Sequence, residues 1–137
     1  MSTQNPEAEN EARRVCEQAN KTVNDRDPEA HLQTLNTPHV RIAAGRVRVW
    51  NTIEELQASY LPLVTQPLEE GWHHSTIDRM DIVHSRPDKV HVDLQYTRWT
   101  KANHPIAVYE ALWIATCVAG HWGLQVRSSF APLGEDR

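Results

Sequence analysis

Titratable and aromatic side chains gather in the stretch EGWHHSTIDRMD, residues 70–81. On a strand, alternation places Trp72, His74 and Asp78 on one face, with His74 and Asp78 about 13 Å apart. An imidazole and a carboxylate facing one apolar cavity would suit proton transfer, as in a dehydration or an isomerisation. Tyr60, from a preceding helix, would add a phenol. These four residues are candidate catalytic (His74, Asp78) and ligand-binding (Tyr60, Trp72) groups; the alternative is a core Trp72 beside polar surface groups.

A second candidate set lies where the strand VHVDLQYTRW, residues 90–99, meets the next strand. If the turn between them centres on Asn103, Tyr96 lies opposite Glu110, and Arg98 is the diagonal neighbour of Glu110, all on the apolar face. Tyr96 and Arg98 would then bind a ligand at a pocket mouth, and a desolvated Glu110 would act as a general base. The alternative is a rim salt bridge between Arg98 and Glu110, worth about 0–1 kcal/mol.

The sequence holds no pattern of a metal or phosphate site. Its adjacent histidines, His73 and His74, point to opposite faces of a strand and cannot readily share one ion. There is no HExxH, no CxxC, no carboxylate-rich loop and no GxGxxG. Cys16 lies in the middle of an apolar helical stripe and is expected to be packed rather than nucleophilic. We expect no metal and no cofactor.

Composition indicates an ordinary globular domain. The 137 residues are 39% hydrophobic and 23% charged, and the net charge of -4 comes from interleaved charges. This pattern argues against nucleic acid or an anionic membrane as the main partner, and no apolar run approaches the ~20 residues of a membrane span. The polar, acidic N-terminus does not resemble a signal peptide. Cys16 and Cys117 are expected as free thiols in a cytoplasmic protein.

The elements that must position these side chains are helices first and strands second. The first helix, residues 6–25, has an apolar stripe that includes Ala12, Cys16 and Ala19. A short helix follows Asp27, and a capping box of Thr52 and Glu55 opens a third helix that Pro62 ends or kinks. The predicted strand regions are 39–50, bent or folded into a hairpin around Gly45, then 73–84, 89–100, 105–117 and 121–130. This order predicts an α+β fold with a curved sheet and helices on one face, as a single domain over 6–132 with loose ends at 1–5 and 133–137.

Three segments of the chain resemble the NTF2-like superfamily, and within it the SnoaL-like and ketosteroid-isomerase-like proteins. They are NDRDPEAHLQTLNTPHVRI (24–42), DKVHVDLQYTRW (88–99) and YEALWIATCVAGHWGLQVRSSFAP (109–132), and the resemblance covers about residues 8–132. It implies a cystatin-like α+β cone: a strongly curved, mostly antiparallel sheet wrapped around N-terminal helices, with a pocket at the open end. Members are often dimers.

The ketosteroid isomerase chemistry does not carry over. Those enzymes use a Tyr on the first helix and an Asp on the first strand, and the matching positions here are Ala19 and Ala43. An alanine can neither hydrogen-bond an enolate nor move its proton. The resemblance therefore predicts the fold and leaves two classes of function open. One is a pocket for a small, partly apolar organic molecule, acting as a lyase, isomerase or cyclase; the other is a non-catalytic ligand-binding or assembly module.

The outward face of the strands is the expected partner surface. With the turn centred on Asn103, Trp99, Tyr109 and Trp113 share a mostly polar face, and aromatic residues among polar groups are typical of a partly wet interface. We expect a homodimer through this face. The alternative is that other elements of the same subunit cover these aromatic rings.

Overall fold

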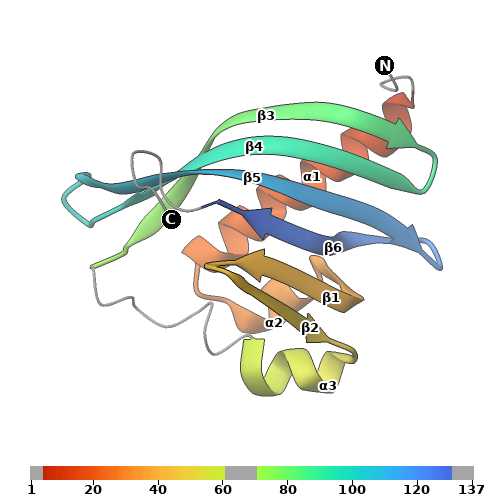
Figure 1. The fold of residues 1–137 in the computed structure, drawn as a ribbon, viewed down its shortest axis with the longest axis horizontal. Coiled ribbons are helices and arrows are strands. Elements are labelled where there is room, and N and C mark those ends of the chain that lie inside the picture. The colour runs from red at the N-terminus through yellow and green to blue at the C-terminus, as the bar shows by residue number, and fades with distance from the viewer. Residues whose placement is uncertain (1–4, 61–70, 131–137) are drawn as a thin grey trace.

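The computed structural model describes residues 5–60 and 71–130. Its six strands form one sheet in the order β2-β1-β6-β5-β4-β3, in which every neighbouring pair is antiparallel except β1 and β6 (Figure 1). The fold is α+β, as the sequence predicts. The elements are α1 (Pro6–Asn24), α2 (Pro28–Leu32), β1 (Leu35–Ala43), β2 (Arg46–Trp50), α3 (Ile53–Glu55), a π-helical turn η1 (Leu56–Tyr60), β3 (His74–Arg86), β4 (Lys89–Trp99), β5 (Pro105–Val118) and β6 (His121–Ser129).

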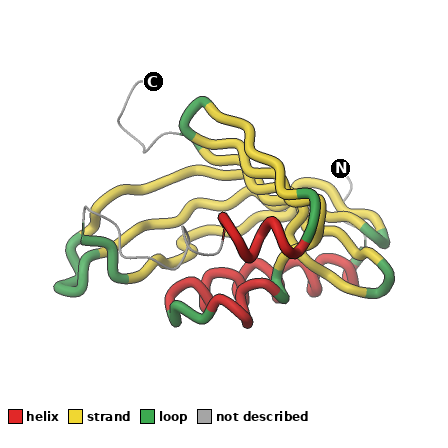
Figure 2. Tube along the Cα trace, turned by 90° about the horizontal axis from the view of Figure 1, so that it is seen from below, coloured by secondary structure: helices red, strands yellow, loops and turns green. Residues whose placement is uncertain are grey.

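Helix α1 packs one stripe against the sheet, and all the helices lie on the same side of the bent strands (Figure 2). The stripe is formed by Ala8, Ala12, Val15, Cys16, Ala19 and Thr22, all buried. Small residues dominate it, so the helix axis can approach the sheet closely. We call the sheet face toward the helices the inner face.

The predicted caps and turns are present. The Asp27 side chain accepts a hydrogen bond from the Ala30 amide at 3.1 Å and so begins α2. The Thr52 hydroxyl accepts from the Glu55 amide at 3.2 Å, which is the first bond of a capping box, and it donates to the Glu55 carboxylate at 3.3 Å. The region 39–50 is a hairpin with Gly45 in its two-residue turn. The predicted kink at Pro62, residues 1–4 of the loose end predicted at 1–5, and the loose end at 133–137 lie outside the described residues. Asn5 is described, and its side-chain amide donates to the Ser85 carbonyl at 2.8 Å.

The predicted register of the β4–β5 hairpin is wrong by one residue. Tyr96 lies opposite Tyr109, and Glu110 lies opposite Gln95. Two features produce the difference. Trp99 pairs with Pro105, so the turn centres on Ala102 instead of Asn103, and Arg98 pairs with Ala107, so Ile106 is an extra residue on β5. Because side chains alternate with a period of two, the net shift of one residue reverses every face assignment on β5 while β4 keeps its predicted faces.

The inner face of the central strands is apolar and forms the core with α1. Its fully buried members on β4 are Val90, Val92 and Leu94. Their neighbours on β5 are Ala115, Trp113 and Ala111, all buried. Trp113 and Tyr109 therefore belong to the inner face, and the prediction that they join Trp99 on an outer partner surface is wrong.

Candidate functional site

Four polar residues from four different elements meet in the core beneath the sheet. They are His31 of α2, His39 of β1, Tyr60 of η1 and Arg127 of β6, and we call them the inner cluster. The first three are fully buried. Each of the four has one buried polar atom without a hydrogen-bond partner among the described residues: Nε2 of both histidines, the Tyr60 hydroxyl and Arg127 Nε. Native interiors rarely leave such atoms unsatisfied, so the cluster needs an explanation.

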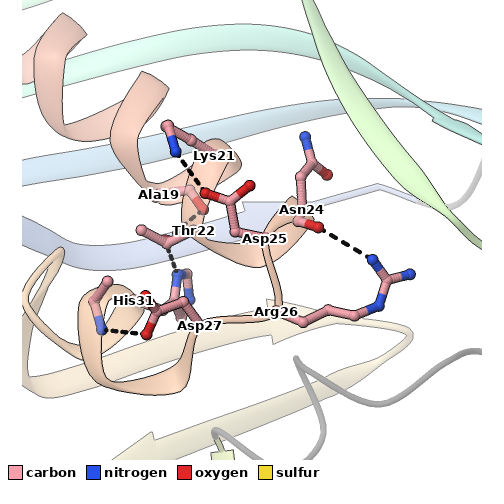
Figure 3. Close-up of polar contacts among 9 residues, drawn as sticks. Ala19, Lys21, Thr22, Asn24, Asp25, Arg26, Asp27 and His31 are labelled. Carbon is pink, nitrogen blue, oxygen red and sulfur yellow. Dashed lines mark hydrogen bonds and ion pairs between the residues drawn. The ribbon is translucent and has the colours of Figure 1, made fainter.

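His31 is fixed by the end of α1. Its Nδ1 lies 2.8 Å from the Thr22 hydroxyl, which itself donates to the Ala19 carbonyl at 3.1 Å (Figure 3). Because the hydroxyl proton is used on Ala19, the Thr22 oxygen accepts the hydrogen bond and Nδ1 carries the imidazole proton. Nε2 is then the lone-pair nitrogen, with no partner in the described chain. Burial, with a smaller effect of Arg127, lowers the pKa of His31 to about 3.

His39 has the same arrangement on β1. Its Nδ1 lies 2.9 Å from the Leu124 carbonyl on β6, and a carbonyl can only accept, so Nδ1–H donates. Nε2 is again the lone-pair nitrogen, buried and without a partner in the described residues. Burial and then the charge of Arg127 lower the pKa of His39 to about 3. Both imidazoles are therefore neutral at pH 7 and present a bare nitrogen to the core.

Tyr60 lies among the rings of the cluster. Its ring centroid is 5.4 Å from that of His39, 6.1 Å from that of His31 and 4.9 Å from that of Trp50. The Trp50 indole is held from the other side by the Ser59 hydroxyl at 2.7 Å. The phenol is thus held by packing on its ring, while its hydroxyl has no partner in the described residues.

A bulge turns Arg127 inward. On β6, Leu124 pairs with Ala115 and Val126 pairs with Ile114, so Gln125 is an extra residue. Leu124 and Arg127 consequently share the inner face, whereas strict alternation would separate them. The Arg127 guanidinium lies over two rings, 5.3 Å from the Tyr60 centroid and 5.5 Å from that of Trp113.

The inner cluster contains both hydrogen-bond donors and acceptors that a bound small molecule could use. Arg127 Nε–H donates, the Tyr60 hydroxyl donates or accepts, and the two histidine Nε2 atoms accept. Burial, with a further effect of Arg41, lowers the pKa of Arg127 to about 9, which leaves the guanidinium charged at pH 7. Tyr96, which lies next to Trp113, and Arg41, which is aligned with Arg127 in the sheet, are half-buried.

Of the predicted site residues, Tyr60, Tyr96 and Arg98 face inward. Tyr96 stacks on Tyr109 with 5.1 Å between the ring centroids and lies 6.2 Å from Trp113, at the edge of the inner cluster. Arg98 donates to the Tyr109 hydroxyl at 3.3 Å. Burial raises the pKa of Tyr96. Tyr96, Arg98 and Tyr109 therefore lie together on the inner face of β4 and β5, next to the inner cluster.

The structure does not bring His74, Asp78 or Glu110 to this face. His74 stacks on Trp99 on the outer face, and Glu110 lies there 3.9 Å from Arg79. Asp78 is the extra residue of a bulge in β3, exposed, and it accepts from the Thr76 and Thr97 hydroxyls. The predicted diagonal contact of Glu110 with Arg98 is absent, because the β5 faces are reversed.

Trp72 lies apart from the inner cluster. It is buried under Arg26, whose guanidinium carbon is 4.7 Å from the ring centroid, and its indole donates to the Ser75 hydroxyl at 2.9 Å. These contacts fix the start of β3 against the end of α1.

Reasoning from the sequence did not find His31, His39 or Arg127. A histidine in a short helix and another in a strand carry no mark of burial, and Gly123, two residues before the bulge at Gln125, does not specify which residue is extra. The available signal for Arg127 was its position as a charged residue within a predicted strand, after Leu124 and Val126.

Elsewhere, the described residues form a surface depression but no metal site, membrane-spanning helix or disulfide. A surface depression of about 280 Å³ between α1, α2 and β6 is lined by Arg14, Gln18, Gln33 and Trp122 among others, and offers no acid–base group. No three His, Cys, Asp or Glu side chains of 5–60 and 71–130 come together as metal ligands would. Within those residues, none of the helices has the length and apolar character needed to cross a membrane, and Cys16 and Cys117 are free thiols.

Comparison with solved structures shows an NTF2-like, cystatin-like fold. An NTF2-like protein of unknown function from Pseudomonas putida KT2440 matches with a TM-score of 0.74 at 13% identity, over 96% of this chain and 92% of that one. A protein of unknown function with a cystatin-like fold from Nostoc punctiforme matches with a TM-score of 0.73 at 12% identity, over 92% of both chains. A candidate dehydratase from the NTF2-like family of Streptomyces avermitilis matches with a TM-score of 0.71 at 10% identity, over 95% of this chain and all of that one. No family model and no curated protein matches the sequence.

Proposed function

We propose that this chain, with its NTF2-like fold, binds a small, partly apolar organic molecule against the inner cluster and acts on it by acid–base chemistry. One observation supports this: each of the four residues of the inner cluster has a buried polar atom without a hydrogen-bond partner in the described residues. A ligand with donors for the two Nε2 atoms and an acceptor for Tyr60 and Arg127 would satisfy all four. Trp50 and Trp113 would contact its apolar part.

The reaction class we infer is that of a lyase or an isomerase. A neutral imidazole that has one nitrogen fixed by a carbonyl and the other bare can accept a proton, as His39 would. The Tyr60 hydroxyl would donate to an oxygen on which charge develops. The similarity to a candidate dehydratase fits this class.

A second candidate function is ligand binding without catalysis. It is favoured by the pKa values of about 3 for His31 and His39, because an imidazole of such low basicity is a poor general base at neutral pH. In this role the same four atoms would only orient the ligand.

Thermal unfolding in the presence of steroids, polyketides and terpenoids tests the proposal. We expect at least one of these classes to raise the unfolding midpoint of the wild-type chain. Tyr60→Phe should abolish that increase while leaving the ligand-free midpoint equal or higher, because it removes a buried hydroxyl without a partner. Tyr109→Phe is the matched control, since its hydroxyl accepts from Arg98. No increase with any class would contradict the proposal.

The ligand found in this way separates catalysis from binding. Incubated with the protein in deuterated water and followed by proton NMR, it should exchange a C–H hydrogen or lose water if the chain is an enzyme. His39→Gln should stop that change. A ligand that binds and stays chemically unaltered would establish the binding function instead.

A further inference from the structure

Three arginines stand side by side on the inner face of neighbouring strands. In the register, Arg48 of β2 lies opposite Arg41 of β1, and Arg41 is aligned with Arg127 of β6. Paired residues share a face of the sheet, so all three lie on the inner side with Trp113, the partner of Arg127 on β5. We call Arg48, Arg41 and Arg127 the arginine row.

The arginine row runs from solvent into the core. Arg48 is exposed, Arg41 is half-buried, and Arg127 reaches the inner cluster with its Nε fully buried. Three like charges along one line, next to low-dielectric walls, concentrate a positive potential at the buried end. This contrasts with the chain as a whole, whose net charge is -4.

No carboxylate of residues 5–60 and 71–130 forms an ion pair with the row: the ion pairs there join other residues, and none includes Arg48, Arg41 or Arg127. Around the Arg127 guanidinium lie the rings of Tyr60 and Trp113, with the neutral His31 and His39 nearby. Arg127 is half-buried, with its Nε shielded from solvent. A partly desolvated cation without a counter-charge among the described residues is costly to the fold, and such a cost is typical of groups kept for a ligand.

We propose that the arginine row receives a carboxylate of the ligand, with Arg127 as its direct partner and Arg41 and Arg48 as guides toward it. This assignment rests on the proposed function, because it names a chemical group of the molecule bound at the same site. The carboxylate would accept from Arg127 Nε–H and from the Tyr60 hydroxyl, two of the atoms without a partner in the described chain. A hydroxyl or amino group on the same ligand would donate to a histidine Nε2.

Propionate and propionamide test the assignment, because they have the same size and differ in charge. The readout is the Arg127 Nε–H signal in nitrogen–proton NMR spectra, assigned by its absence from Arg127→Met. We expect propionate to shift this signal in a saturable manner by about 50 mM, and propionamide to bind at least about tenfold more weakly. Propionate should also raise the unfolding midpoint of the wild type and not that of Arg127→Met.

Further variants keep the test decisive. Arg41→Met should weaken propionate binding several-fold even if Arg127→Met does not fold, whereas Arg86→Met, at the far end of β3, should leave it unchanged. Equal binding of acid and amide would overturn the assignment, as would tighter binding of phenyl phosphate than of propionate. A neutral steroid or terpenoid that binds equally to the wild type and Arg127→Met would overturn it and leave the proposed function standing. Propionate binding without any hit in the thermal screen would support the carboxylate assignment and contradict the proposed function.

Discussion

His31 and His39 stay neutral because the fold buries them beside a guanidinium. Each ring uses Nδ1–H in a short hydrogen bond to a neighbouring element, so each is also fixed in one tautomer. The orientation of His31 is therefore set by the Thr22 side chain of α1, and that of His39 by the Leu124 carbonyl of β6. A change of protonation would place a second cation next to Arg127, at a high cost in free energy.

Lowering the pH should destabilise the protein already at pH values well above the pKa of its carboxyl groups. In the folded chain both histidines remain neutral down to a pH of about 3, whereas an unfolded imidazole binds a proton near pH 6.5. Between these values the unfolded state holds more protons, so the free energy of unfolding rises with pH, by up to about 2.7 kcal/mol per pH unit for two groups. Urea unfolding between about pH 5 and 6.5 measures this slope.

Single variants test whether His31 and His39 cause this dependence of the free energy of unfolding on pH. His31→Gln and His39→Gln should each reduce the slope by about half, whereas His104→Gln, in the exposed β4–β5 turn, should leave it as in the wild type. A slope that both core variants retain would mean that other groups take up the protons.

The β1–β2 and β5–β6 hairpins use the same turn. Ala44–Gly45 and Ala119–Gly120 are two-residue connections in which both residues have positive φ: 53° and 73° in the first, 51° and 82° in the second. This is the geometry of a type I′ turn, which favours Asn-Gly. An alanine pays a steric penalty in this left-handed region.

Replacing either alanine should therefore stabilise the fold. We expect Ala44→Asn and Ala119→Asn to raise the free energy of unfolding by about 0.5–1 kcal/mol each, and additively, because the turns are in separate hairpins. Ala102→Asn is the control, as Ala102 is not among the residues with positive φ. Chemical denaturation measures the change, and a loss of stability in both turn variants would contradict the type I′ assignment.

The order and extent of the elements were predictable from sequence, and the faces of two strands were not. Turn residues such as Gly45 and Gly120 and the caps at Asp27 and Thr52 bound the elements closely. Pro105 and Gly123 lie near the bulges at Ile106 and Gln125, but they do not specify which residue is extra, and each bulge shifts the alternation by one residue. Tyr96 and Arg98 were therefore placed on the inner face correctly, while Glu110 was placed there wrongly and Arg127 was missed.

The outer face of the sheet is apolar across four strands. The register aligns Val49, Val40, Val126 and Ile114 in one row and Val47, Ile42, Ser128 and Leu112 in the next. Of these, Val47 is 67% exposed and Val49 48%. A contiguous apolar area of this kind is typical of an interaction site. We propose that a second copy of the chain covers it, giving a homodimer whose interface differs in residues from the aromatic one predicted from sequence.

Sedimentation velocity at tens of micromolar should show a species near twice 15.7 kDa. Leu112→Glu should convert it to the monomer, because the charge would be buried against the partner copy without compensation. Ile53→Glu, an equally apolar and exposed position on α3, should leave the dimer intact. A wild-type chain that sediments as a monomer would rule out this partner.

The parallel pairing of β1 with β6 has a consequence for how the chain is made. His39 donates to the Leu124 carbonyl, 85 residues later in the chain. On the side of β1 away from β2, the neighbouring strand is β6, the last strand of the sheet (Figure 1). On the ribosome, the β1–β2 hairpin must therefore wait with one edge of β1 unpaired until β6 has emerged. Because ordering that joins distant parts of a chain is slow, we expect the inner cluster to be completed only at the end of folding. The site and the native topology are then acquired in the same late step.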